Sequence, residues 1–285
     1  MLIGFSYSLI SALFYSVNNI FSKKITQKVN ELETFFISNM FLTIISGFIA
    51  FTFGDFNFTF NLEIFLIVLI GSLFGFIAFL CFLYSFKNFY VSESLVIANT
   101  NPFVVLIFSI LLFNEKISLI EFIGMITVFY GIYSIIRNKS KFRINKNVIL
   151  PFITSLGWGV YSLVIITLLR LNMNIFYIVF ILEAGILLFL IFYLLLFKIK
   201  INKKIFTSSY ILKNGFLAGI TTNFGTLFST LAFKTINPPI ASSIISSQVL
   251  FASFFGYLFL KEKVTHKQFI GYFLVFLGLV IFYFF

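Results

Sequence analysis

The chain has 285 residues, of which 60% are hydrophobic and 10% are charged, and its formal net charge is +11 at pH 7. A soluble domain carries about 25% charged residues, so a soluble fold of this length is excluded. The basic residues lie in short loops between apolar segments, which indicates membrane topology and not a nucleic-acid footprint. With one cysteine, Cys81, and one histidine, His266, neither a disulfide nor a Cys/His metal site is expected.

Ten apolar segments have about the 20 residues that a transmembrane helix needs. Helices are expected because each satisfies its backbone polar groups internally. The loops between them are too short for a soluble domain. We therefore predict an all-α, multi-pass integral membrane protein of a prokaryotic cell (inner) membrane. Its predicted spans are Leu2–Phe21, Thr34–Phe53, Leu62–Phe86, Ser92–Phe113, Leu119–Ile136, Val148–Leu169, Ile175–Phe197, Ile211–Phe233, Ile240–Leu260 and Lys267–Phe285.

The second half of the chain repeats the first. Near the start of each half, an offset of 143 residues aligns Ser11–Asn18 with Thr154–Tyr161. Five spans per half is an odd number, so the second half enters the membrane with opposite polarity. This predicts two inverted five-helix repeats, residues 1–140 and 147–285, with a site near the midplane where they meet. Further matches, each 147 residues apart, pair Asn114–Ser118 with Lys261–Thr265, Gly124 with Gly271, and Gly131 with Gly278.

These motifs resemble the EamA repeat of the drug/metabolite transporter (DMT) superfamily. The resemblance covers nearly the whole chain and implies a ten-helix transporter. Members carry small solutes such as amino acids, choline, nucleotide sugars and triose phosphates. Two positions depart from the pattern, because Val249 stands at the equivalent of Pro102, and Tyr15 stands where many members have a tryptophan. The residues that carry the resemblance are Pro102, Leu112–Ser118, Glu121, Gly124 and Gly131, repeated by Leu260–Thr265 and Gly271.

Two arguments on orientation disagree. By the predicted spans, 17 of the 20 Lys and Arg residues lie in odd-numbered loops. The positive-inside rule then places those loops in the cytoplasm and both termini outside. The family resemblance implies cytoplasmic termini, so the sequence leaves orientation open.

Glu183 is the carboxylate that lies deepest inside a predicted span, about nine residues into Ile175–Phe197. Ionisable groups at membrane depth are costly and mark function by default. Facing a cavity, Glu183 would bind an amine or another cationic group, or carry a coupled proton. The alternative is a structural residue hydrogen bonded between helices. An offset of 144 residues makes Asn39 its repeat partner.

Aromatic and polar residues form matching pairs on the first and sixth spans. Tyr15 with Asn18, and Trp158 with Tyr161, are spaced i, i+3 and share a helix face. Because the repeat places the two pairs on opposite sides of its pseudo-axis, we hypothesise that they line one central cavity. Ordinary helix packing is the alternative.

A proline marks the fourth span. Pro102 removes a helix hydrogen bond and weakens the preceding turn, which contains Asn99 and Asn101. Such a turn can bind a polar ligand or act as a hinge, and a simple kink is the alternative. Gln248 is the repeat equivalent of Asn101, and Asn223 on the eighth span is a further candidate.

Together these features predict a secondary transporter that moves a small organic metabolite by alternating access, with an amino acid or amine-bearing solute favoured. A phosphorylated or nucleotide metabolite is less favoured, because no Lys or Arg lies deep in a span. A membrane-embedded lipid-modifying enzyme would need an acid/base or metal cluster, which one buried glutamate does not supply. We predict no enzymatic activity, catalytic residue, metal or cofactor. The expected partners are the solute, the lipid bilayer and a coupling proton, with the chain acting as a monomer or homodimer.

Overall fold

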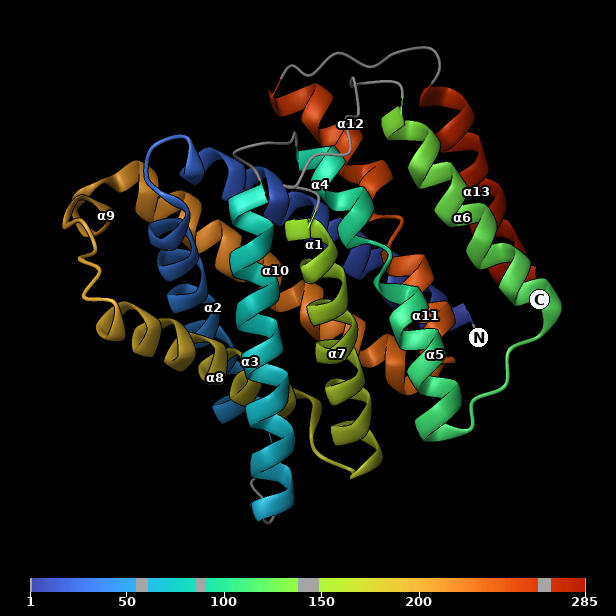
Figure 1. Cartoon of the computed structure of the whole chain (residues 1–285), viewed down its shortest axis with the longest axis horizontal. Helices are drawn as coiled ribbons and strands as arrows, with labels where there is room; N and C mark the ends of the chain where they lie inside the picture. Colours follow the sequence, from blue (N-terminus) through green and yellow to red (C-terminus); the bar gives the residue numbers. More distant parts are fainter. Residues whose placement is uncertain (1, 55–60, 86–90, 138–148, 261–267, 285) are drawn as a thin grey trace.

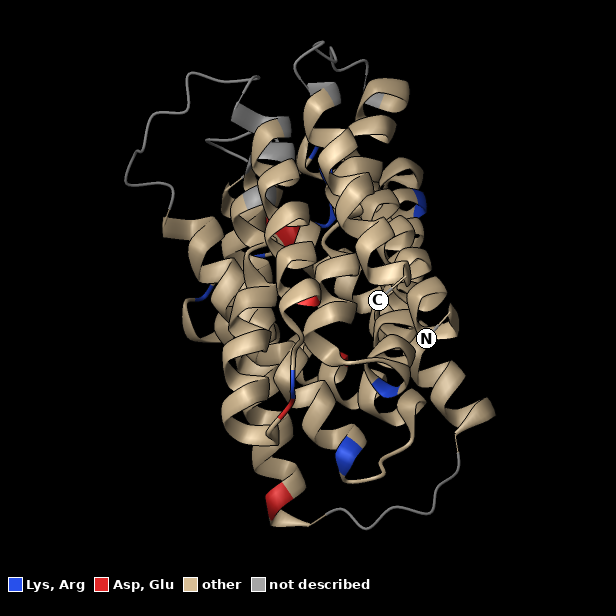
Figure 2. Cartoon of the chain, turned by 90° about the vertical axis from the view of Figure 1, so that its right-hand side faces the viewer, with Lys and Arg blue, Asp and Glu red and all other residues tan. Residues whose placement is uncertain are grey.

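The structure is a computed structural model that describes residues 2–54, 61–85, 91–137, 149–260 and 268–284. Within these ranges the chain forms α-helices and no strand, which confirms the all-α prediction (Figure 1). Nearly the whole ribbon is uncharged, as Figure 2 shows. The helices are α1 (Leu2–Thr26), α2 (Glu31–Phe53), α3 (Leu62–Ser85), α4 (Val91–Ala98), α5 (Asn101–Phe113), α6 (Leu119–Arg137), α7 (Ile149–Arg170), α8 (Ile175–Leu196), α9 (Lys204–Thr207), α10 (Ser209–Thr235), α11 (Pro238–Ile245), α12 (Gln248–Leu260) and α13 (Gln268–Phe284).

Asparagines set several helix ends. Asn30 caps α2 in a capping box, in which its Oδ1 accepts from Glu33 N at 2.8 Å and its own N–H donates to Glu33 Oε2 at 3.1 Å. Asn174 caps α8 by accepting from Phe176 N at 2.9 Å. Asn114 ends α5 with a φ of 54°, a left-handed conformation that asparagine tolerates. Short polar caps thus separate the long apolar helices.

Six helical segments of the described residues are long and apolar enough to cross a membrane. They are accompanied by the shorter apolar helices Asn101–Phe113, Leu119–Ser134 and Ile270–Phe284. A multi-pass membrane protein is therefore confirmed, whereas the count of ten spans is not. The six segments are Glu31–Phe53, Leu62–Ser85, Ile149–Arg170, Ile175–Leu196, Ser209–Thr235 and Pro238–Phe259.

The predicted fourth and ninth spans are both interrupted, at equivalent positions. Thr100 N donates to Ile97 O at 3.1 Å, and Ser247 N donates to Ile244 O at 3.0 Å. Each bond closes a tight i→i−3 turn, and the two turns are 147 residues apart, as the repeat requires. The first interruption lies where Pro102 predicts it. The second has Val249 in place of the proline and was not predicted.

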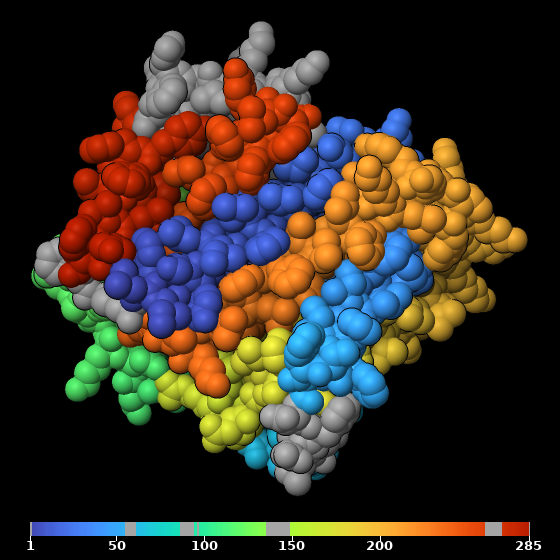
Figure 3. Space-filling view, turned by 180° about the vertical axis from the view of Figure 1, so that it is seen from behind, coloured from blue at the N-terminus to red at the C-terminus, as the bar shows by residue number. Residues whose placement is uncertain are grey.

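The two halves of the chain interdigitate. Helix α1 packs on α10, and α3 packs on α7. In the repeat, α1 is equivalent to α7 and α3 is equivalent to α10, so these two contacts are equivalent to each other. The contact of α2 with α10 is related in the same way to that of α8 with α3. Seen from behind, the N-terminal helix lies between the last helices of the chain and α10 (Figure 3). Neither half therefore forms a core by itself.

Helices α6 and α13 are repeat equivalents and lie side by side at one edge of the molecule (Figure 1). A Cβ placed on Gly131 would lie 2.6 Å from Val275 N, and one placed on Gly124 would lie 3.0 Å from Phe282 Cε1. Glycine is needed at Gly131 because the two backbones approach too closely there for a side chain. Since the earlier residue of α6 meets the later residue of α13, the two helices run antiparallel.

Candidate functional site

A cavity lies between the two halves of the protein. It is lined by α1, α2, α3, α7, α8, α10 and α11 and by residues at both helix interruptions. The space open to the centres of water-sized molecules is about 130 Å³, many times the roughly 10–15 Å³ that one water requires. Nine of the ten predicted site residues line it, namely Tyr15, Asn18, Asn39, Asn99, Asn101, Trp158, Tyr161, Glu183 and Gln248. Their role in binding stays a prediction.

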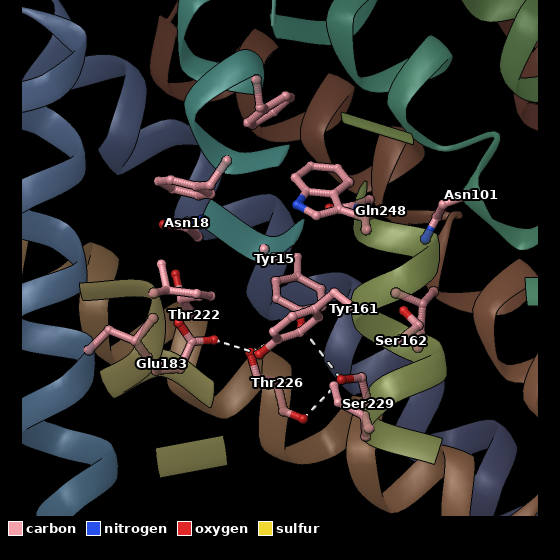
Figure 4. A pocket seen from close by; sticks show the side chains of 18 of the residues that line it. Tyr15, Asn18, Asn101, Tyr161, Ser162, Glu183, Thr222, Thr226, Ser229 and Gln248 are labelled. Atoms are coloured by element: carbon pink, nitrogen blue, oxygen red, sulfur yellow. Dashed lines mark hydrogen bonds between the residues drawn. The ribbon is translucent and has the colours of Figure 1, made fainter. Parts of the chain in front are cut away.

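Glu183 is held by donors from two other helices. Asn39 Nδ2 on α2 donates to Glu183 Oε2 at 3.1 Å, and Tyr161 OH on α7 donates to Oε1 at 2.8 Å (Figure 4). The carboxyl is buried, with 5% of the residue exposed. Both carboxylate oxygens are therefore hydrogen bonded, and Glu183 lines the cavity. Asn39 and Glu183 are repeat partners, so their direct contact places the pseudo-two-fold axis beside this carboxyl.

Close helix packing brings these groups together. A Cβ on Gly75 of α3 would lie 2.7 Å from Ile186 Cδ1 and 3.0 Å from the Tyr161 ring. Thr43 Oγ1 on α2 donates to the backbone oxygen of Glu183 at 3.3 Å. Helices α2, α3 and α7 thereby fix α8 at the level of its carboxylate.

Tyr15 extends the polar surface onto α10. Its OH donates to Thr226 Oγ1 at 3.2 Å and lies 3.4 Å from Ser229 Oγ (Figure 4). Gly225 makes room for the Tyr15 ring, because a Cβ there would lie 2.8 Å from it. Ser11 Oγ on α1 donates to the Gly225 carbonyl at 2.8 Å. One edge of the cavity is therefore rich in hydroxyl groups.

Amide side chains connect the two helix interruptions. Gln248 Nε2 at the start of α12 donates to Asn99 Oδ1 at 2.9 Å. Asn19 Nδ2 on α1 reaches Gln248 Oε1 at 3.5 Å, a long hydrogen bond. Asn99 Nδ2 also donates to Leu95 O at 2.6 Å, the same carbonyl that accepts from Asn99 N at 2.8 Å at the end of α4. Figure 4 shows Gln248 and Asn101 on the opposite side of the view from Glu183, with Tyr15 and Tyr161 between them.

Asn223 differs from the other nine predicted residues. It is fully buried in α10 and does not line this cavity. Its amide oxygen and nitrogen find no hydrogen-bond partner within the described ranges. Its neighbour Thr222, which was not predicted, lines the cavity instead. Asn18 does line the cavity, where its Oδ1 accepts from Ser22 Oγ at 3.2 Å.

Sequence reasoning also missed Asn19 and the serines and threonines of the lining. Small hydroxyl residues are common in packed membrane helices, so individually they carry no signal. Their density in α10 and α11 was a usable sign that these helices face a polar space. The missed polar lining residues are Asn19, Ser38, Ser162, Thr222, Thr226, Ser229, Ser242 and Ser246.

The lining has an acidic character. Among the described residues that form it, Glu183 is the one carboxylate, and none is a Lys, Arg or His. Aromatic rings cover much of the rest, and Trp158 packs on Phe82 with ring centroids 4.9 Å apart. No group of three His, Cys, Asp or Glu side chains that could hold a metal ion occurs in the described part of the chain. The cavity thus combines aromatic walls and polar side chains with the carboxylate of Glu183.

The halves are also joined beyond the cavity. Ile165 lines the cavity, and Arg170 ends the same helix, where it forms an ion pair with Glu115 of the first half. The Arg170 guanidinium also lies 4.4 Å from the centroid of the Phe113 ring. Asn237 Nδ2 donates to the Lys116 carbonyl at 3.0 Å. The loop between α5 and α6 is therefore attached to the second half.

Comparison with known proteins supports the transporter resemblance. The model of the EamA-like transporter family matches twice, over residues 2–137 and 145–284. One solved structure, described only as "Crystal structure of protein", is similar with a TM-score of 0.78 and 13% sequence identity, over 98% of this chain and 94% of that chain. At this identity the likeness concerns the fold alone. No curated protein gives a significant match.

Proposed function

Because the chain belongs to the EamA-like transporter family, we propose that it is a secondary transporter of a small amine-bearing solute. The observation that carries this proposal is the buried carboxylate of Glu183, facing a cavity whose described lining has no basic side chain. A cationic amine is the solute group that such a carboxylate neutralises. The aromatic lining adds cation–π attraction and binds the apolar part of the solute.

Alternating access is the proposed mechanism, with ten spans arranged as two inverted repeats. The antiparallel contact of the equivalent helices α6 and α13 supports the inversion. The six long apolar segments would be joined by four further crossings, made by α1, the interrupted pair α4–α5, α6 and α13. One half would then rock against the other around the cavity. Arg170 and Glu115 would separate when the halves move apart at that end.

Within this proposal, an amino acid or a simple amine is favoured over a phosphorylated solute. A phosphate would bring negative charge beside Glu183 with no Lys or Arg in the described lining to neutralise it. Glu183 is also the proposed binding site of a coupling proton, because a protonated carboxyl no longer neutralises an amine. The membrane would be a prokaryotic cell membrane, as the sequence predicts.

A binding experiment tests the proposal directly. Purified full-length protein would be screened by thermal shift against phenethylamine, phenylalanine, choline and glucose 6-phosphate, because a ligand of the folded state raises the unfolding temperature. We expect stabilisation by phenethylamine that is lost in Glu183→Gln. Glu121→Gln is the matched control, since Glu121 is a carboxylate that only caps α6 by accepting from Ser118 N at 2.7 Å. Stabilisation by glucose 6-phosphate alone would refute an amine carrier.

Any solute that binds would then be followed into proteoliposomes in radiolabelled form. We expect time-dependent accumulation that the Glu183→Gln variant lacks. Binding without accumulation under any imposed gradient would refute transport and leave only a binding protein.

A further inference from the structure

Two polar oxygen atoms of α2, which supplies a hydrogen bond to Glu183, have no partner in the described part of the chain. They are Asn39 Oδ1 and Ser38 Oγ, on consecutive residues of α2 that both line the cavity. Asn39 is 4% exposed and Ser38 is 5% exposed. Buried polar atoms of this kind are normally hydrogen bonded, so each unpaired one needs an explanation.

The orientation of the Asn39 amide follows from chemistry. An ionised carboxylate only accepts hydrogen bonds, so the amide nitrogen must face Glu183, as its 3.1 Å contact with Oε2 shows. The amide oxygen is then turned away from Glu183 and is left as a free acceptor next to the carboxylate.

Ser38 differs from the other serine of its helix. Ser46, eight residues further along α2, satisfies its hydroxyl by donating to Thr43 O at 3.1 Å. Such a bond to the preceding turn is the ordinary solution for a buried serine in a helix. Ser38 makes no bond of this kind with the described residues. Its hydroxyl is therefore left without a partner at the wall of the cavity.

We propose that Glu183, Asn39 and Ser38 form a site for a primary ammonium group, so that the transporter selects primary amines against quaternary ammonium ions. The inference rests on the proposed amine transport and names the amine class. A primary ammonium has three N–H donors, which match the carboxylate, the amide oxygen and the serine oxygen. A quaternary ammonium has none.

Charge and aromatic rings alone would not make this selection. The aromatic rings of the lining, Phe82, Trp158 and Tyr161, attract any cation. Quaternary ammonium ions commonly bind to aromatic side chains through cation–π interactions. The two unpaired acceptors decide the preference, because a cation without donors leaves them buried and unpaired. An unsatisfied buried acceptor lowers an affinity by about tenfold.

The test uses two probes with the same ring and the same charge, phenethylamine and its N,N,N-trimethyl derivative. Their dissociation constants would be measured by calorimetry with the purified full chain. We expect the primary amine to bind at least about tenfold more tightly. Ser38→Ala should weaken only the primary amine, by roughly three- to tenfold. Ser46→Ala, a matched serine that does not line the cavity, should change neither affinity.

The outcomes separate this inference from the proposed function. Equal or tighter binding of the trimethyl probe, with both probes lost in Glu183→Gln, overturns the primary-ammonium site and leaves amine transport standing. An equal effect of Ser38→Ala on both probes also overturns the site. Failure of both probes and of phenylalanine to bind, with glucose 6-phosphate bound instead, overturns the amine proposal and this inference together.

Discussion

Replacing Pro102 with alanine tests how the fourth span is interrupted. Pro102 lies in the first turn of α5, after the N-cap Thr100, and it is buried. Its missing N–H is then no loss, because the first N–H groups of a helix have no intrahelical partner. Alanine removes two buried methylenes, worth about 0.8 kcal/mol each. Alanine also raises the conformational entropy of the unfolded chain, which lowers the stability by a further amount of about 0.4–1 kcal/mol. We expect Pro102→Ala to lower the free energy of unfolding by about 2–3 kcal/mol.

A continuous helix through this region predicts the opposite sign. Proline in a helix interior costs about 3 kcal/mol, so its removal would stabilise the protein. The matched control is Val249→Ala at the repeat equivalent, which also deletes two carbon atoms from a fully buried side chain. Both variants would be unfolded by denaturant in detergent. The interrupted helix would be refuted if Pro102→Ala were more stable than the wild type while Val249→Ala was less stable.

Other predictions concern packing and surface charge, measured by the same unfolding assay. Gly219→Leu should lower the free energy of unfolding by about 1–3 kcal/mol, because a Cβ there would lie 2.8 Å from Leu42 N. Lys213→Leu, at an exposed position of the same helix, should change it by less than about 0.5 kcal/mol, and equal effects of the two would contradict the packing. Arg170→Gln should cost about 1 kcal/mol or less despite the ion pair with Glu115, since Arg170 is 46% exposed; a loss above about 2 kcal/mol would contradict a solvent-screened pair.

Much of the architecture follows from sequence patterns that act locally. Apolar length places the helices, and the capping box of Asn30 and Glu33 fixes where α2 begins. The repeated motifs, with Gly124, Gly131 and their partners, indicate two related halves. These signals are readable because each depends on neighbours in the chain or on a fixed offset. Contacts between the halves depend on the whole fold, and no pattern in the sequence predicts that α1 packs on α10.

In the candidate site, too, some residues could be predicted from the sequence and others depend on the whole fold. Glu183 and the matched pairs of α1 and α7 are conspicuous because polar groups at membrane depth are rare. Asn223 is also buried but does not line the cavity. Which residues of α10 reach the cavity depends on how the helix packs, and the sequence does not show this. The interruption before Val249 carries no proline, so composition gives no warning of it. It lies at the repeat equivalent of the interruption between α4 and α5, so only the comparison of the two halves points to it.

The symmetry of the two halves can be tested at the cavity itself. Asn39 and Glu183 are repeat partners whose side chains touch, at 3.1 Å between Nδ2 and Oε2. Asn39→Glu alone sets two buried carboxylates side by side, which should destabilise the protein. The double variant Asn39→Glu/Glu183→Asn again pairs one carboxylate with one amide on the pseudo-axis. We therefore expect it to be more stable than Asn39→Glu, with a coupling energy of about 0.5–3 kcal/mol in a double-mutant cycle.

The amine probe then separates two consequences of the exchange. Phenethylamine should still stabilise the double variant, because a carboxylate remains in the cavity, although Tyr161 now faces an amide and its 2.8 Å bond to Glu183 Oε1 is lost. The affinity should fall by about tenfold, since one charge-assisted hydrogen bond no longer orients the carboxylate. A double variant as unstable as the sum of its single changes would show that the two positions are not equivalent across the axis. The pairing of Asn39 with Glu183 would then be a contact of one conformation and not a consequence of the repeat.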